Sequence, residues 1–135
     1  MPVDPRQWSE AERWLARVDE DLRAAGALLT ITPPALGAAA FHCQQAVEKM
    51  AKAVLIALRQ PPPKQHDIEE LGRRVRAHHA ALGEAFGEFA GLTRWYVSAR
   101  YPDAGVDEEP TREEVREVLA RLHELRRRVH ELAPE

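Results

Sequence analysis

Apolar side chains are densest between Ala38 and Leu58, where a helix would present them around most of its circumference. One broad face carries Ala40, Cys43, Ala46, Val47, Met50, Val54, Ala57 and Leu58. The other side mixes polar and apolar residues, namely Phe41, Gln44, Gln45, Glu48, Lys52, Leu55 and Ile56. A surface helix has a narrower apolar stripe. We therefore predict a central helix whose second face is covered by a bundle neighbour or by a second copy of the chain.

A first helix is predicted upstream of this segment. Its N-terminus lies either at Asp4-Pro5, with the aspartate as cap, or at Ser9. Its apolar stripe consists of Leu15, Val18, Leu22, Ala25 and Leu29. Most of its acidic residues, Asp21 among them, are expected to lie away from that stripe. Thr32-Pro33-Pro34 should end the helix, because a proline disfavours helical geometry in the residue before it.

Three more helices are predicted after the stiff link Pro61-Pro62-Pro63. One opens at Asp67, and one spans residues 82–100. The last is capped by Thr111 and Glu114. The 82–100 helix contains glycines at every fourth position, which permit a close neighbour but each cost about 1 kcal/mol of helix stability. These glycines are Gly83, Gly87 and Gly91.

The helical periodicity and the short connections predict an all-α protein, an up-and-down bundle of four to five helices in a single domain over residues 1–135. Its 135 residues are 44% hydrophobic and 30% charged, with a net charge of −3. The chain has no run of membrane-spanning length and no signal-peptide pattern, so we expect a cytoplasmic protein. The single cysteine, Cys43, is expected to be a buried side chain rather than a reactive thiol.

The most basic surface is predicted on the helix that follows Asp67. It carries Arg73, Arg74, Arg76, His78 and His79. Cations near a helix C-terminus are favoured by the helix dipole, so a solvated face explains them, and a phosphate-binding face is the alternative. Adjacent histidines point about 100° apart on a helix, which argues against a zinc site.

Several segments together resemble the HEPN domain family over about residues 8 to 132. They are residues 40–49 with Lys52-Ala53, then Pro63, His66-Asp67-Ile68 with Leu71, Tyr96-Val97 and residues 99–103. The resemblance implies a helical bundle that pairs as a homodimer. It also implies an association with minimal nucleotidyltransferases, often in toxin–antitoxin systems.

Many members of that family are metal-independent endoribonucleases, which use an arginine and a later histidine with four to six residues between them. The matching arginine here is Arg100, but the corresponding places beyond it hold Gly105, Val106 and Asp107. Other arginine–histidine pairs of similar spacing, such as Arg73 with His79, are weak evidence in a chain with many arginines. The resemblance thus implies a phosphate or nucleotide contact at Arg100 and does not extend to catalysis. Alternatively, Arg100 pairs with nearby carboxylates of its own loop.

We therefore expect a non-catalytic, nucleotide-binding and interaction module. Its expected partners are a second copy of the chain, a minimal nucleotidyltransferase, and a nucleotide or RNA, with no cofactor or metal. The expected contact residues are Arg100, Tyr101, Tyr96, Arg73 and His79. An endoribonuclease with a displaced histidine and a purely structural assembly scaffold are the alternatives.

Overall fold

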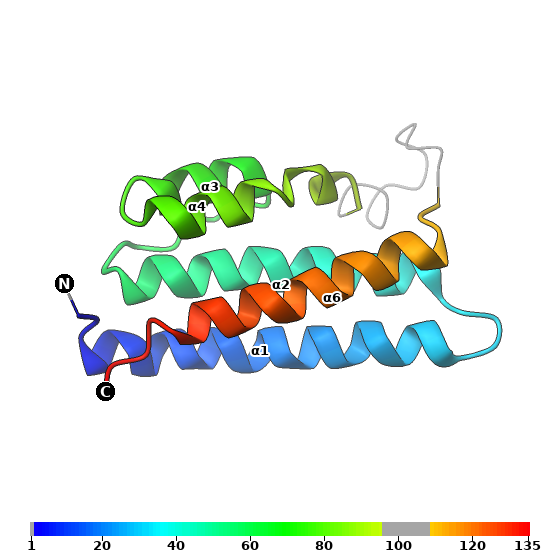
Figure 1. Cartoon of the computed structure of the whole chain (residues 1–135), viewed down its shortest axis with the longest axis horizontal. Helices are drawn as coiled ribbons and strands as arrows, with labels where there is room; N and C mark the ends of the chain where they lie inside the picture. Colours follow the sequence, from blue (N-terminus) through cyan, green and yellow to red (C-terminus); the bar gives the residue numbers. More distant parts are fainter. Residues whose placement is uncertain (1, 96–108) are drawn as a thin grey trace.

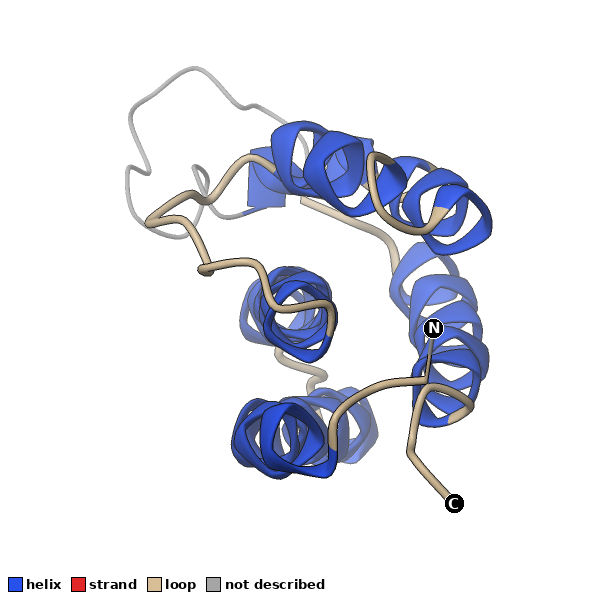
Figure 2. Ribbon diagram, turned by 90° about the vertical axis from the view of Figure 1, so that its left-hand side faces the viewer, coloured by secondary structure: helices blue, strands red, loops and turns tan. Residues whose placement is uncertain are grey.

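The structure, a computed structural model, describes residues 2–95 and 109–135. Within these ranges the chain forms helices and contains no strand, which confirms the predicted all-α fold (Figures 1 and 2). The helices are α1 (Pro5–Thr30), α2 (Leu36–Ala57), α3 (Ile68–Arg76), α4 (Ala80–Gly87), the 3₁₀ turn η1 (Ala90–Leu92) and α6 (Arg112–His130).

Three long helices form the body of the bundle. Helices α1 and α2 run antiparallel along most of their lengths, and α6 packs against both in the same direction as α2 (Figure 1). The short helices α3 and α4 form a hairpin, and α3 packs against α2. Helix α2 therefore lies between the other two long helices and the hairpin, as predicted for a central helix.

The helix starts follow the predicted caps. The side chain of Asp4 accepts a hydrogen bond from the backbone N–H two residues on, and Pro5 is the first residue of α1, so the alternative start at Ser9 is wrong. Asp67 caps α3 in the same way. Thr111 and Glu114 form the reciprocal capping box of α6. Each cap provides acceptors for N–H groups that have no partner within the helix.

The helix predicted for residues 82–100 is interrupted. Helix α4 ends at Gly87, and η1 follows before helical structure resumes at Thr93. The close approach predicted for the three glycines is correct at Gly83, where an added Cβ would lie 2.3 Å from the Cα of Arg76 in α3. At Gly87 and Gly91 an added Cβ would meet nothing within 4 Å. Of these three glycines, only Gly83 is needed for the α3–α4 packing.

The second face of α2 is covered by the chain itself. Leu55 and Ile56 are only 1% and 7% exposed, so other parts of the same chain pack over them. They therefore form no apolar surface for a second copy of the chain, and of the two predicted covers a bundle neighbour is correct for both. Phe41 remains half-buried, with its ring edge-on to His42 at 6.1 Å between centroids.

A second correction concerns α1. Asp21 was expected to lie away from the core stripe, yet it is 7% exposed and faces α2.

No helix in the described ranges is both long enough and apolar enough to cross a membrane.

The two glycines of α4 make a matched pair of test substitutions. We expect Gly83→Ala to lower the free energy of unfolding by about 2 kcal/mol or more, because its methyl group would meet backbone atoms that cannot move aside. Gly87→Ala should change stability little or raise it slightly, since its Cβ has open space. Urea denaturation of both variants would measure this, and equal destabilisation would contradict the close packing of α3 and α4.

Candidate functional site

Of the five contact residues expected from the sequence, the structure describes two, Arg73 and His79. Arg100, Tyr101 and Tyr96 lie outside the described residues. Arg73 is exposed, and its guanidinium pairs with the carboxylate of Glu70, one turn earlier on α3. His79 lies at the N-terminus of α4, where its Nδ1 accepts a hydrogen bond from a backbone N–H of the first turn. Arg73 and His79 thus each have a contact of their own, and nothing brings them together on a ligand.

The basic surface of α3 is partly neutralised within its own helix. Arg73 and Arg74 both bond to the carboxylate of Glu70 and hold its pKa below the usual range for a glutamate. A groove of about 600 Å³ beside these residues includes three more carboxylates. It is lined by Glu69, Gly72, Arg73, Arg76, Gly83, Glu84, Gly87, Glu88 and Ala90. Such a mixture of charges favours the interpretation of this surface as a solvated helical face.

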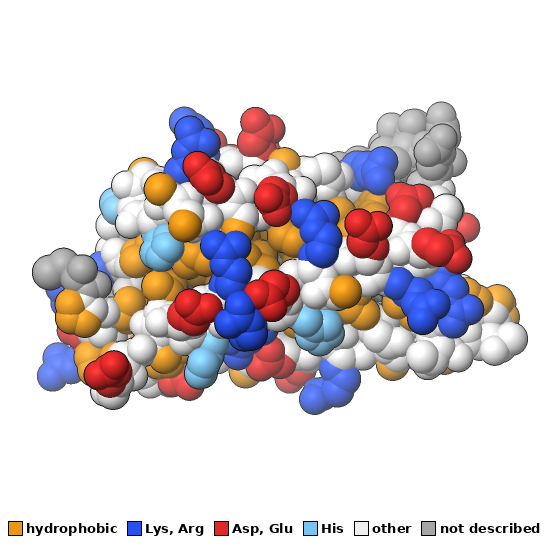
Figure 3. Space-filling model, viewed as in Figure 1, with side chains coloured by type: hydrophobic (Ala, Val, Ile, Leu, Met, Phe, Trp, Pro, Cys, Tyr) orange, Lys and Arg blue, Asp and Glu red, His pale blue; other side chains and the backbone are white. Residues whose placement is uncertain are grey.

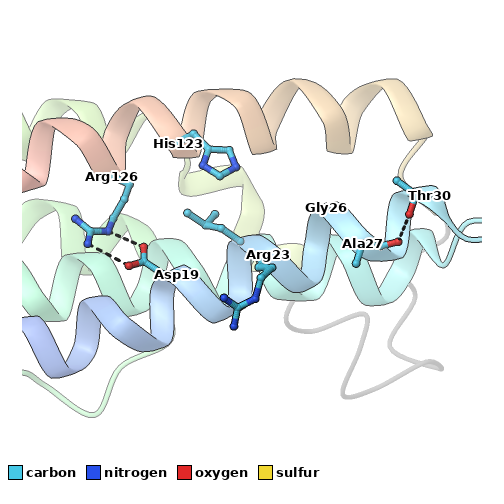
Figure 4. Close-up of a pocket in the computed structure, with 8 residues that line it drawn as sticks. Asp19, Arg23, Gly26, Ala27, Thr30, His123 and Arg126 are labelled. Atoms are coloured by element: carbon cyan, nitrogen blue, oxygen red, sulfur yellow. Dashed lines mark hydrogen bonds and ion pairs between the residues drawn. The ribbon is translucent and has the colours of Figure 1, made fainter.

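A second groove, of about 590 Å³, lies between α1 and α6 (Figure 4). Arg126 of α6 donates a hydrogen bond to Asp19 of α1 across this groove, at 2.8 Å. His123 projects from α6, and Arg23 from α1. Figure 4 shows Arg23 extending away from α6, so these cations do not converge on one point. On the face seen in Figure 3, acidic and basic side chains are interspersed. Neither the groove nor this face offers a concentrated anion site.

The polar residues of α2 form the most enclosed polar cluster. Glu48 is 4% exposed, and its carboxylate accepts hydrogen bonds from Lys52 at 2.9 Å and from Gln44 at 3.1 Å. The Nδ1 of His66, from the link before α3, lies 2.8 Å from the same carboxylate. Gln45 donates in turn to Gln44. The set predicted on the second face of α2 is therefore a connected network within one chain, with Glu48 at its centre.

Asp21 is the centre of a second cluster, between α1 and α2. Its Oδ1 lies 2.8 Å from Nδ1 of His42, and its Oδ2 accepts a hydrogen bond from Lys49 at 2.7 Å. The side chains of His42 and Lys49 are 33% and 28% exposed, so both lead from the buried carboxylate to the surface. Sequence periodicity contains a signal for this cluster. Asp21 stands three residues after Val18 and four before Ala25, both fully buried, and shares their face of α1.

The cysteine beside this cluster is unsuited to nucleophilic chemistry. Cys43 is fully buried, and burial, together with the nearby charge of Asp21, raises the pKa of its thiol to about 12. The thiolate is the reactive form, so the thiol is nearly inert at neutral pH. Among the described residues no three histidine, cysteine or acidic side chains are grouped to hold a metal ion.

The sequence matches the HEPN domain family over residues 11–132, nearly the whole chain. The chain belongs to the HEPN domain family. Comparisons with curated proteins and with solved structures found no match. The match confirms the resemblance drawn from the sequence, and the helical bundle is consistent with it.

In this HEPN domain three histidine side chains form hydrogen bonds or ion pairs within the described residues. His42 lies against Asp21, His66 against Glu48, and His79 caps α4. His42 and His66 each have a buried carboxylate on one ring nitrogen, a partly exposed side chain and a lysine on the same carboxylate. The two clusters differ in the lysine, because Lys49 beside Asp21 is 28% exposed and Lys52 beside Glu48 only 10%.

The Glu48 network provides a stability test. We expect Glu48→Leu to lower the free energy of unfolding by about 3 kcal/mol, because it leaves the largely buried Lys52 ammonium without its partner. The double variant Glu48→Leu/Lys52→Met should recover part of the loss, since it removes the uncompensated charge. Chemical denaturation of both variants measures this. A double variant less stable than Glu48→Leu would contradict the argument.

Cys43 provides a second test. The native protein should resist a thiol reagent such as DTNB at pH 8, where a pKa of about 12 leaves roughly one thiol in ten thousand ionised. In guanidinium chloride one thiol per chain should react at once. Rapid labelling of the folded protein would show that Cys43 is accessible and would contradict its burial.

Proposed function

We propose that this HEPN domain is a non-catalytic module that binds a nucleotide through Arg100 and acts together with other proteins. An arginine is well suited to this contact, because its planar guanidinium can donate two hydrogen bonds to one phosphate. Tyr96 and Tyr101 would add a stacking ring or a hydroxyl donor. Arg73 and His79 are assigned at most a secondary contact, since both already have partners in the protein.

One observation carries the non-catalytic part of the proposal. Cleavage of RNA needs a group that moves a proton near neutral pH, and histidine is the usual one. No histidine follows Arg100 with four to six residues between them. His79, from one of the other arginine–histidine pairs, accepts a hydrogen bond at Nδ1 as the cap of α4, so its Nε2 carries the proton and is not free to act as a base. The protein would therefore hold a nucleotide without cleaving RNA.

The proposed partners are a second copy of this chain and a minimal nucleotidyltransferase, in a system of the toxin–antitoxin type. Family membership supports this pairing, and a small nucleotidyltransferase encoded next to this chain would strengthen it. Of the apolar residues first considered for a homodimer contact, the half-buried Phe41 remains, since Leu55 and Ile56 are buried within the chain.

An endoribonuclease with a displaced histidine is the second candidate function. The observation that favours it is the Asp21–His42 contact, because a carboxylate bonded to one ring nitrogen orients an imidazole for proton transfer at the other. This function requires His42 and Arg100 to act on the same RNA.

The test measures nucleotide binding and RNA cleavage on the same protein. Calorimetry with ATP and incubation with labelled single-stranded RNA would compare the wild type with Arg100→Ala. We expect no cleavage, and ATP binding that weakens about tenfold or more in Arg100→Ala, as for the loss of a charged hydrogen bond. Arg13→Ala is the control, since Arg13 is an exposed arginine of α1 whose only described ion pair is a 3.8 Å contact with Glu10.

Two further variants distinguish the alternatives. His79→Asn keeps a side-chain acceptor at the helix cap and removes the imidazole. His42→Gln removes the imidazole beside Asp21. Cleavage by the wild type that is lost in Arg100→Ala and in either histidine variant would overturn the non-catalytic function and identify the displaced histidine. ATP binding unaffected by Arg100→Ala would overturn the assigned contact.

A further inference from the structure

Asp21 brings together two side chains from separate turns of α2. His42 and Lys49 stand seven residues apart and so share one face of the helix. Each occupies a different oxygen of the Asp21 carboxylate, at 2.8 and 2.7 Å. Because both groups bond to one small carboxylate, the imidazole and the ammonium group are held on the same part of the surface. Their partial exposure places this pair at the surface between α1 and α2.

The contact with Asp21 also fixes what the imidazole can offer a ligand. An ionised carboxylate only accepts hydrogen bonds, so the Nδ1 of His42 carries the proton in this pair. The Nε2 atom is then the nitrogen left for a ligand. It accepts a hydrogen bond when the ring is neutral and donates one when the ring is charged. Lys49 has three donors, of which Asp21 uses one.

The charges around this pair favour an anion. With His42 protonated, the imidazolium and the Lys49 ammonium carry two positive charges against one negative charge on Asp21. Gln45 stands between them along the same side of α2 and is neutral. Within the described residues neither His42 nor Lys49 pairs with a carboxylate other than Asp21.

Stability alone does not explain the cluster. Burying an ion pair costs desolvation free energy, and apolar side chains of similar size often stabilise a core as well or better. What the buried carboxylate does achieve is orientation, because it holds two flexible side chains in one place before a ligand arrives. Such preorganisation reduces the entropy lost on binding.

We propose that His42 and Lys49, held by Asp21, form a binding site for a phosphate or diphosphate group. The inference rests on the proposed function in one respect only, that a nucleotide is the source of this phosphate or diphosphate group. A phosphate oxygen would accept from the Lys49 ammonium and a second oxygen from Nε2 of the protonated His42. A carboxylate ligand carries a single charge and only two oxygens, so it should bind this site more weakly.

The test follows the His42 ring directly. The side-chain resonances of the six histidines can be observed by NMR, and His42→Gln assigns the signal of His42. Pyrophosphate would be titrated at pH 6.5 and constant ionic strength, with acetate as the comparison anion. We expect a saturable shift of the His42 resonances with pyrophosphate, and at least tenfold weaker binding of acetate. An unshifted His42, or a response to acetate of equal affinity, would overturn the proposal.

The lysines of the chain provide matched variants, since they number only three. Lys49→Met should weaken pyrophosphate binding at least tenfold, and Lys49→Arg should retain most of it because the charge remains. Lys64→Met is the control, because Lys64 is exposed and lies in the link before α3. Circular dichroism checks that each variant is folded. If Lys49→Met does not fold, the pyrophosphate titration of the wild type still tests the proposed site. Equal affinity in folded Lys49→Met would contradict the site.

The same measurements separate this inference from the proposed nucleotide function. ATP binding that depends on Arg100 while His42 remains unshifted by pyrophosphate would overturn the His42–Lys49 site and leave the nucleotide function standing. The opposite result is a His42 shift with pyrophosphate, together with ATP binding that is no tighter than pyrophosphate binding and does not depend on Arg100. It would overturn the nucleotide function and leave the His42–Lys49 site standing.

Discussion

Helix α2 has to bury almost its whole surface, and the rest of the bundle depends on how that is achieved. Of its 22 residues, 15 are buried, and these include Gln44, Glu48 and Lys52. A buried polar group is costly unless it is hydrogen-bonded. Here each is satisfied within the chain, and every buried polar side-chain atom in the described ranges has a partner. The network around Glu48 lets a helix with polar residues occupy the centre of the protein.

The same constraint links the central helix to its neighbours. Glu48 is reached by His66 from the segment before α3, and Asp21 of α1 is reached by His42 and Lys49 of α2. The two carboxylates therefore connect three segments far apart in the sequence. Directional contacts of this kind fix the rotation of α2 more strictly than apolar packing alone, because a rotated helix would leave buried charges unpaired.

For function, the important feature is that both clusters reach the surface through a histidine, but only the Asp21 cluster also has a partly exposed lysine. The Glu48–Lys52 pair is almost entirely enclosed, with side chains 5% and 10% exposed, which suits a structural role. The Asp21 cluster has a similar buried carboxylate but two partners that extend to solvent. Several exposed cations of α3 and α6, by contrast, pair along their own helices, as Arg127 does with Glu124 and Glu131. Such exposed pairs contribute little to stability or specificity.

Local sequence patterns determined the all-α class, the central position of α2 and the caps at Asp4, Asp67 and Thr111. These features depend on residues within one or two turns of each other, and the periodicity of apolar residues records them directly. The family, too, followed from short runs of sequence. The common face of the polar residues of α2 followed for the same reason, since their spacing places them on one side of a helix.

Tertiary structure decided the rest, because it depends on which helix packs against which. Leu55 and Ile56 lie on the face predicted to be covered by a bundle neighbour or by a second copy of the chain, and both are buried within the chain itself. The break after Gly87 accompanies packing of α4 against α3 that helical periodicity does not report. Asp21 has an acidic side chain on an apolar face, and only the distance to two partners more than 20 residues away explains its burial. The sequence of α1 alone cannot show that His42 and Lys49 of α2 contact Asp21.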